Sequence, residues 1–360
     1  MPMTDRECFS RIMRYQTADR IPLHLVGAWP DTLARWHNEG LPKDVDVHTF
    51  LGVQSMQSKY IGCNTGLYPP FETRVLEEND ECVITVDTYG RKVRDFKNHT
   101  SMPEWIEFPV KTPADLRRLM DEHYQLDPIA ARFPANWEQQ VRAAEQSGAV
   151  MIIDGGCAYG TLRNLAGVEY SSYLFFDAPQ LVHEWFERYF TVVMAGIRQA
   201  ARWTHECVLG FGEDIAFKTA PLISPELFGQ FLYPGHKTAM ELARGFGMDL
   251  TWYDSDGGIR LLMPQYFDLG INTFAPCEVA ANMAPVALRR QFGRQIRMLG
   301  GLDKREIAKG KTAIAAEIQR NLPVIREGGY IPAIDHSVSA DISFDNYRYY
   351  VEMMEKVLAG

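Results

Sequence analysis

The chain has 360 residues, of which 46% are hydrophobic and 23% charged, and its formal net charge is −9. This is the composition of a globular protein, and no stretch approaches the ~18 consecutive apolar residues that a membrane span needs. The basic residues are scattered, which argues against a nucleic-acid partner because binding to phosphate backbones needs grouped Lys and Arg. We therefore expect no nucleic acid and no membrane as partners, but small molecules or proteins.

The N-terminus and the cysteines indicate the compartment. The first twenty residues mix acidic, basic and polar side chains without a continuous apolar run, so residues 3–15 are expected to form an amphipathic helix rather than a secretory signal. The six cysteines are widely spaced and form no CxxC pair, as in a protein with reduced thiols. We predict a cytoplasmic protein.

Two kinds of segment follow the first helix. Residues 20–26 (RIPLHLV) form a short apolar run after a Thr-Ala-Asp turn, which is typical of a first buried strand. Residues 72–96 alternate in polarity and are interrupted by an Asn-Asp and a Tyr-Gly pair, the pattern of antiparallel hairpins. We predict a hairpin insertion over about residues 66–108 that lies over one end of the main sheet.

From about residue 110 onward, helical stretches alternate with short apolar runs, which indicates a parallel α/β architecture. The runs are AVMIIDG (149–155), CVLGFGED (207–214), MDLTWYDSDG (248–257), GINTFAPCE (270–278), QIRMLGGLD (295–303) and GGYIPAIDH (328–336). With residues 20–26 they make seven, and we place the eighth among residues 51–63. The sequence thus predicts an α/β fold, one (β/α)8 TIM-barrel domain over residues 1–360, with the antiparallel hairpin insertion in its N-terminal third.

Five of the predicted strands end in polar residues: Asp214, the pair Asp254 and Asp256, Glu278, Asp303 and His336. The C-terminal ends of barrel strands converge on one mouth, so we expect these side chains to share a site. Asp254 and Asp256 stand at i and i+2 on an extended segment, where they point to the same face and can approach one ion. The alternative is that they form an Asx turn and cap a helix near Ile259.

Glu278 and His336 each have two interpretations. An unpaired buried carboxylate is costly, so Glu278 needs a cation or donor, and the alternative to a functional role is an ion pair with Arg260 or Arg289. His336 is either a metal ligand or acid–base group, or a satisfied polar residue. Its neighbour Asp335 can orient a loop.

The remaining polar candidates are weaker. Asp214 binds substrate or holds a loop, Asp303 can be a helix cap, and Cys277 alternates away from Glu278 into the core. Aromatic residues near strand ends, predicted to bind substrate unless they are core packing, are Trp252, Tyr253, Tyr330 and Tyr159. The chain has no Walker loop, GxGxxG fingerprint, HExxH helix or GxSxG elbow, so we set nucleotide-binding and serine-hydrolase functions aside.

Several segments, in order and spacing, resemble the uroporphyrinogen decarboxylase superfamily, specifically its methyltransferase-like branch. They are DRIP (19–22), GEDIAFKTAPLISPELFGQFLYP (212–234), DSDGGI (254–259), PCEVAANM (276–283), FGRQIRMLGGLDKREIAKG (292–310) and GGYIPAIDHSVSADISFDNYRYY (328–350). The resemblance covers nearly the whole chain and implies the barrel fold. Authentic decarboxylases carry an Arg-rich motif after the first strand, where this chain has LHLVGAWPDTLARW. Without that carboxylate clamp, tetrapyrrole decarboxylation ranks low.

The resemblance also implies a metal site. The Zn-binding His and Cys of the branch match Asp254 and Asp256, a Glu of the similar cobalamin-independent methionine synthase matches Glu278, and the last Cys matches His336. A divalent metal, with zinc as the expected ion, would then be held by these four residues, one carboxylate orienting His336. Such ligands suit activation of oxygen better than activation of a thiol.

The resulting functional hypothesis is a uroporphyrinogen decarboxylase-like methyltransferase, with metal assistance and Asp214, Asp256 and His336 as catalytic residues. It would exchange a methyl group between a small substrate, such as a methoxylated compound, and a cobamide carried by a corrinoid protein. One alternative is a metal-free decarboxylase, a lyase acting on a small carboxylic acid, in which an Asp stabilises a protonated intermediate and His336 delivers a proton. The other is a non-catalytic subunit that binds a small molecule or corrinoid. The sequence leaves a homodimer open.

Overall fold

The computed structural model describes residues 2–97 and 102–358. Its main sheet has seven strands in the order β1-β6-β7-β8-β9-β10-β11, and every neighbouring pair is parallel. The strands are β1 Ser58–Tyr60, β6 Val150–Asp154, β7 Cys207–Gly212, β8 Leu250–Asp254, β9 Thr273–Ala275, β10 Arg297–Leu302 and β11 Tyr330–Ile334. Six lie inside the predicted apolar runs and β1 inside residues 51–63. The predicted parallel α/β barrel is therefore confirmed.

Residues 20–26, predicted as the first strand, are irregular instead. The N–H of Met56 donates to the carbonyl of Leu23, and the N–H of Val338 donates to the carbonyl of Gly27. The segment thus lies between the β1 side of the sheet and the loop after β11, and it fills the gap in the barrel wall. These bonds are too isolated to make a ladder, and the proline within the segment has no N–H to contribute.

Strand side chains alternate between the barrel interior and the surrounding helices. Val150 and Ile152 of β6 belong to the inner cluster, whereas Met151 and Ile153 belong to the outer one, as the period of two requires. Helix α1 (Asp5–Met13), the predicted first helix, adds its buried side chains to the inner cluster and so closes the N-terminal end of the barrel. The opposite, C-terminal end is left as the mouth.

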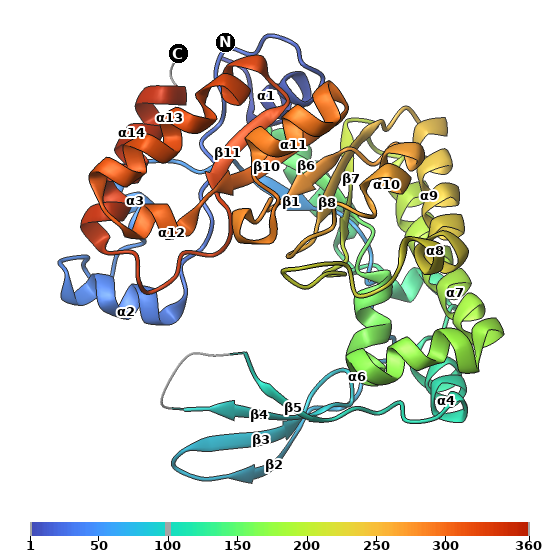
Figure 1. Ribbon diagram of the computed structural model, residues 1–360. Coiled ribbons are helices and arrows are strands. Elements are labelled where there is room, and N and C mark those ends of the chain that lie inside the picture. Colours follow the sequence, from blue (N-terminus) through green and yellow to red (C-terminus); the bar gives the residue numbers. More distant parts are fainter. Residues whose placement is uncertain (1, 98–101, 359–360) are drawn as a thin grey trace.

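The other helices surround the sheet (Figure 1). They are α2 Pro30–Asn38, α3 Val47–Leu51, α4 Pro113–His123, η1 Ile129–Arg132, α5 Trp137–Ser147, α6 Ala158–Asp177, α7 Pro179–Ala200, α8 Pro225–Leu227, η2 Phe228–Leu232, α9 Tyr233–Gly245, α10 Met263–Leu269, η3 Val279–Ala281, α11 Pro285–Phe292, η4 Gly293–Gln295, α12 Lys304–Ala308, α13 Lys311–Glu327 and α14 Phe344–Leu358. Among the described residues, none of these helices combines the length and apolar character needed to cross a bilayer.

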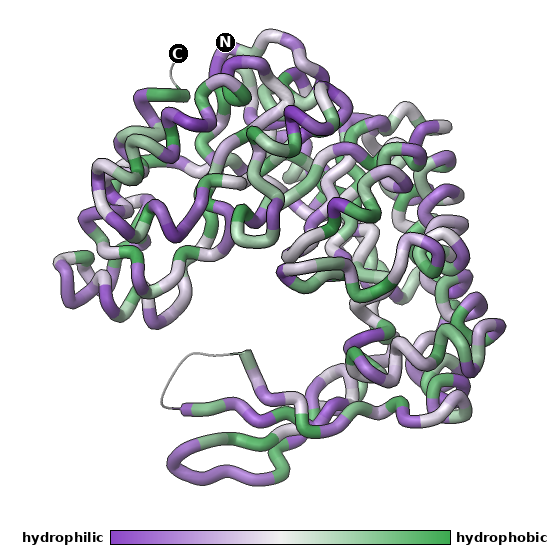
Figure 2. Tube along the Cα trace, in the orientation of Figure 1, coloured by the Kyte–Doolittle hydropathy of each residue, from purple (hydrophilic) through white to green (hydrophobic). Residues whose placement is uncertain are grey.

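The insertion is a separate antiparallel sheet of four strands, β2 Arg74–Glu78, β3 Cys82–Val86, β4 Lys92–Phe96 and β5 Glu104–Glu107. It lies within the predicted range 66–108 and projects from the barrel (Figure 1), and the turn between β2 and β3 is hydrophilic (Figure 2). At its base, Arg91 donates a hydrogen bond to Asn164 of α6, and Tyr89 reaches the barrel mouth. The predicted antiparallel insertion is confirmed, as four strands.

Candidate active site

A cavity of about 260 Å³, here called the mouth recess, opens at the C-terminal ends of β6, β7 and β8. It is lined by Tyr60, Thr65, Gly66, Tyr89, Ile152, Asp154, Gly156, Cys157, Thr161, Tyr189, Gly210, Phe211, Gly212, Trp252 and Asp254. Two of these are acids, Asp154 at the end of β6 and Asp254 at the end of β8. Because catalytic groups of barrels of this class collect at this end, the mouth recess is the candidate active site.

The mouth recess exists because β7 carries glycines where its neighbours carry side chains. In the strand register, Gly210 stands between Asp154 and Trp252, and a Cβ on Gly210 would come within 2.6 Å of a methyl group of Ile152. A Cβ on Gly212 would meet no atom within 4 Å. The space in front of Gly212 is therefore open, and any larger residue at this position would enter it.

Both acids of the mouth recess lie in surroundings that disfavour the charged form of the carboxyl group. Burial, and next the negative charge of Asp256, raises the pKa of Asp254 to about 6, although solvent still reaches this carboxylate through the mouth. Burial also raises the pKa of Asp154, against a hydrogen bond from the Gly156 N–H at 2.8 Å. Among the described residues, neither acid forms an ion pair. The two carboxylates therefore lack a counter-ion.

The other side of the mouth behaves differently, because its acids have partners. Oδ2 of Asp256 lies 3.2 Å from Nε2 of His336, and this hydrogen bond raises the pKa of His336 against the effect of burial. Glu278 accepts the N–H of Gly257 at 2.9 Å and lies 4.0 Å from Nζ of Lys304. Asp256 and His336 thus form a pair that can hold a proton at the mouth.

Two structural alternatives considered for these acids are wrong. Glu278 pairs with neither Arg260 nor Arg289, since the guanidinium of Arg289 lies 3.0 Å from Glu327. The acids after β8 do not cap a helix near residue 259, because α10 begins only at Met263. They instead border the mouth, as their position at a strand end predicts.

The four side chains predicted as metal ligands are not assembled into a metal site. They are Asp254, Asp256, Glu278 and His336. Within residues 2–97 and 102–358, no three or more His, Cys, Asp or Glu side chains are arranged to hold a metal ion. Asp256 and His336 contact each other, whereas Glu278 turns to a backbone N–H. As arranged, these residues do not fit the expected zinc ion.

The other predicted acids have local structural partners. Asp214, with a φ of 48°, accepts a hydrogen bond from Arg163 at 2.9 Å, which ties the loop after β7 to α6. Asp303 caps α12 by accepting the N–H of Arg305, which confirms the cap alternative. Asp335 accepts one backbone N–H from the loop after β9 and one from the start of α12, so it does orient loops next to His336.

Of the four predicted substrate-binding aromatic residues, Trp252 lines the mouth recess. The structure places Tyr253, Tyr330 and Tyr159 elsewhere, with no exposed surface. Tyr253 shares a hydrogen bond with Tyr266 between the sheet and α10, and Tyr330 donates to a carbonyl of β10. Neighbouring strand residues face opposite sides, so Tyr253 must turn outward where Trp252 turns inward. These three tyrosines are core residues.

Sequence reasoning missed two acids. Asp154 ends β6 as Asp254 ends β8, so the available signal was its place at the end of its apolar run. Glu213 is fully buried, and its carboxylate accepts the N–H groups of Ala158 at 3.0 Å and Tyr159 at 2.8 Å at the start of α6. Burial raises its pKa to about 7. Glu213 fixes the N-terminus of α6 against β7, directly beside the mouth recess.

A buried histidine accompanies Glu213. Nε2 of His236 lies 3.7 Å from the Glu213 carboxylate, too far for a hydrogen bond, while Nδ1 lies 3.0 Å from the carbonyl of Leu232. Burial lowers the pKa of His236 to about 4, so the ring is neutral at pH 7. The Cys157 thiol, which lines the mouth recess, donates to the Glu213 carbonyl at 3.1 Å. The buried pair of Glu213 and His236 therefore supports the mouth recess from beneath.

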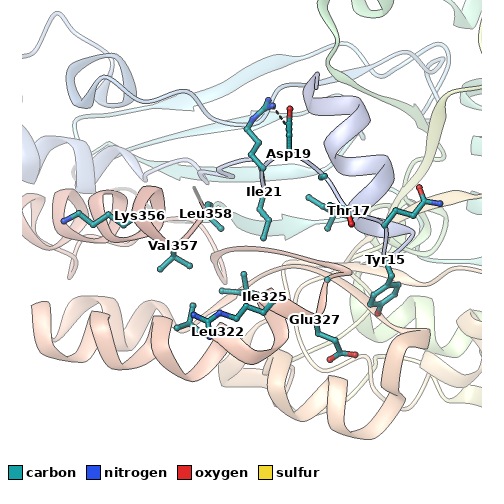
Figure 3. Close-up of a pocket in the computed structure, with 16 residues that line it drawn as sticks. Tyr15, Thr17, Asp19, Ile21, Leu322, Ile325, Glu327, Lys356, Val357 and Leu358 are labelled. Carbon is teal, nitrogen blue, oxygen red and sulfur yellow. Dashed lines mark ion pairs between the residues drawn. The ribbon is translucent and has the colours of Figure 1, made fainter. Parts of the chain in front are cut away.

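A larger cavity of about 620 Å³ lies at the opposite end of the barrel (Figure 3). It is bordered by the segment after α1, including Tyr15 and the ion pair of Asp19 with Arg20, and by side chains of α13 and α14 such as Ile325 and Val357. Polar residues at the N-terminal ends of barrel strands mostly serve stability. The smaller mouth recess, and not this cavity, is therefore the candidate active site.

A parallel α/β barrel with acidic residues at the strand ends around a mouth recess is typical of TIM-barrel enzymes. The family model of uroporphyrinogen decarboxylase (URO-D) matches residues 83–357, and the chain belongs to this family. Among solved structures, a methyltransferase from Methanosarcina mazei is similar, with a TM-score of 0.60 and 13% identity over 98% of this chain and 99% of that one. At this identity the likeness shows the fold. The search of curated proteins found no match.

Proposed function

We propose that the protein is a uroporphyrinogen decarboxylase-like methyltransferase that exchanges a methyl group between a small substrate and the corrinoid of a partner protein. The observation that carries the proposal is the charge of the mouth recess. It has two carboxylates and no Lys, Arg or His among its lining residues. A decarboxylase must bind carboxylate substrates, for which cationic side chains are the usual partners, so this lining disfavours the lyase alternative. The fold similarity to the methyltransferase from Methanosarcina mazei agrees.

Two parts of the mouth have distinct roles in this proposal. The mouth recess binds the substrate between side chains of the strand ends and Tyr89 of the insertion, and its open side faces the solvent. The pair of Asp256 and His336 can supply a proton from Nε2 of the imidazole when the leaving atom needs one. The corrinoid supplies the cobalt that gives or takes the methyl group. Its partner protein would approach the open mouth.

Methyl exchange can be measured directly with the purified protein. Methylcobalamin, or its reduced demethylated form, is mixed with the protein and a panel of methoxylated, thiol and N-methylated compounds, and the cobalamin absorbance is followed. We expect exchange with at least one class of compound. Release of CO2 from small carboxylic acids without any methyl exchange would contradict the proposal and favour the decarboxylase. Tight binding of a compound without either reaction would favour a binding subunit.

A further inference from the structure

The mouth recess is a negatively charged cavity without a counter-ion. Asp154 and Asp254 both line it, and the charges of both act on the Tyr60 hydroxyl at its rim, so the two carboxylates share one small volume. Two arginines on α6 or at the base of the insertion already have acidic partners, Arg163 with Asp214 and Arg91 with Asp87. The protein thus leaves two carboxylates open to a ligand.

The same cavity is lined by aromatic rings. Trp252 forms part of the inner wall, where it stacks on Phe9 of α1 with ring centroids 6.0 Å apart. Tyr60 stands at the rim with 64% of its surface exposed, and Tyr89 reaches in from the insertion. Aromatic faces attract cations, and walls of aromatic and acidic side chains are how proteins bind quaternary ammonium groups. Carboxylates and rings together therefore favour a cation over a neutral or anionic ligand.

We propose that the mouth recess recognises its substrate through a cationic, N-methylated ammonium group. This rests on the proposed methyltransferase function and names its substrate class. The ammonium group would be the missing counter-ion of Asp154 and Asp254, and its methyl groups would contact Trp252 and Tyr60. At about 260 Å³, the cavity is smaller than the ~300–1,000 Å³ sites that hold drug-sized ligands, so the substrate is a small molecule.

The chemistry of such a substrate agrees with the residues present. When a methyl group leaves a quaternary ammonium, the carbon–nitrogen bond breaks and its electron pair stays on nitrogen, which departs as a neutral amine. The electron pair of the new bond to carbon comes from the reduced Co(I) corrinoid of the partner protein. No proton is needed at nitrogen, and its positive charge already activates the bond. An ether oxygen, in contrast, would need a proton or a Lewis acid.

The proposal can be tested by binding alone, without a corrinoid. Choline is titrated into the purified protein by calorimetry and compared with 3,3-dimethyl-1-butanol, which has the same shape with carbon in place of the charged nitrogen. The anion 3,3-dimethylbutyrate is the third probe. We expect choline to bind at least about tenfold more tightly than the alcohol, as one lost charge contact predicts, and the anion not to bind.

Two pairs of variants locate the binding site. Asp254→Asn should weaken choline binding about tenfold, whereas Asp249→Asn, at the other end of the same strand and paired with Arg14, should leave it unchanged. Gly212→Leu should fill the mouth recess and abolish binding. Its control is Gly245→Leu, since a Cβ on Gly245 also meets no atom within 4 Å but lies at the exposed end of α9. Circular dichroism and thermal melting confirm that each variant is folded.

The outcomes separate this inference from the proposed function. Four results would each overturn the cationic recess. They are equal binding of choline and the alcohol, preference for the anion, no binding of any probe, and choline binding that survives Gly212→Leu. Methyl exchange with a methoxylated compound but no choline binding would uphold the methyltransferase and reject the ammonium substrate. Choline binding that follows the expected variants, without methyl exchange from any compound, would uphold the recess and reject the methyltransferase.

Discussion

The two sides of the barrel mouth hold similar acids that differ in their cationic partners. On the side of β6 and β8, which we call the open wall, Asp154 and Asp254 face a cavity and form no ion pair among the described residues. On the side of β9 to β11, the paired wall, Asp303 pairs with Arg305, Glu278 lies 4.0 Å from Lys304 and His336 pairs with Asp256. The difference teaches that position at a strand end does not decide whether an acid has a counter-ion. The cationic side chains that the fold brings near it decide this.

The largest expected effect comes from below the open wall, at Glu213. Its two oxygens each accept a backbone N–H of α6, so Glu213→Gln would place an amide NH2 against one of these donors. We expect the free energy of unfolding to fall by about 2 kcal/mol, as for other buried groups left without a partner. Urea denaturation measures this. Asp214→Asn, the adjacent exposed acid, is the control and should change stability by less than about 0.5 kcal/mol. Equal losses in the two variants would contradict the role of Glu213.

Glu213 also predicts how stability depends on pH. Folding raises its pKa from 4.5 to about 7, so the stability that its proton contributes is complete below the unfolded value and is lost as the pH rises through the folded one. Relative to Glu213→Gln, the free energy of unfolding of the unchanged protein should fall by roughly 1 kcal/mol from about pH 6.5 to 8.5. Burial lowers the pKa of His236 and of His24 to about 4, so both act in the opposite direction as their unfolded forms lose a proton, and the comparison with Glu213→Gln removes their effect. Parallel pH profiles for the two proteins would contradict the raised pKa of Glu213.

The next largest expected effect is on the kinetic constants, and it differs between the two walls. With an ammonium substrate, Asp154→Asn on the open wall should raise KM about tenfold without lowering kcat, because the carboxylate stabilises the bound ammonium and this charge declines as the carbon–nitrogen bond breaks. On the paired wall, His336→Gln should change both constants less than about threefold, since a departing amine needs no proton. Steady-state methyl exchange measures both variants. A loss of kcat near 100-fold in His336→Gln would instead show that the paired wall moves a proton.

A smaller expected effect is a change in stability whose sign differs between the two walls. At about pH 7.5, Asp254→Asn should stabilise the protein by about 1 kcal/mol, because burial and Asp256 disfavour the charged form, with allowance for solvent screening. Asp303→Asn should destabilise it by about 1 kcal/mol. Burial alone would raise the pKa of Asp303, but the hydrogen bonds of Arg305 outweigh burial and lower it. Thermal melting that moves in the same direction for both variants would refute the contrast.

The smallest expected signal is metal content. Since the four candidate ligands are not gathered in the described structure, we expect protein expressed in zinc-supplemented medium to hold well below one equivalent of any divalent metal by elemental analysis. One full equivalent, lost in both Asp256→Asn and His336→Gln, would show that the paired wall rearranges to form the zinc site predicted from the sequence. Glu306→Gln, at a half-buried acid on α12 that pairs with Lys309, serves as the control.

The sequence by itself determined the barrel and the end at which its candidate site lies. Apolar runs of strand length between helices placed six of the seven parallel strands, and the polar residues at their ends marked the mouth, because these patterns depend only on residues close together in the chain. The same local signals offered a helix cap as one role for Asp303 and the orientation of a loop as a role for Asp335, and the structure shows both. They failed for residues 20–26, whose apolar pattern suits a strand but whose neighbours leave it without a ladder.

The tertiary structure alone decided which acids stay unpaired. Asp154, Gly210 and Trp252 come from three strands, and only their register creates the mouth recess. Likewise, Glu278 turns away from a shared site because the Gly257 N–H, from another strand end, lies 2.9 Å away. Periodicity states which face a side chain occupies, but its charge and chemistry depend on donors that are remote in sequence. For this reason the acids could be predicted, and their partners could not.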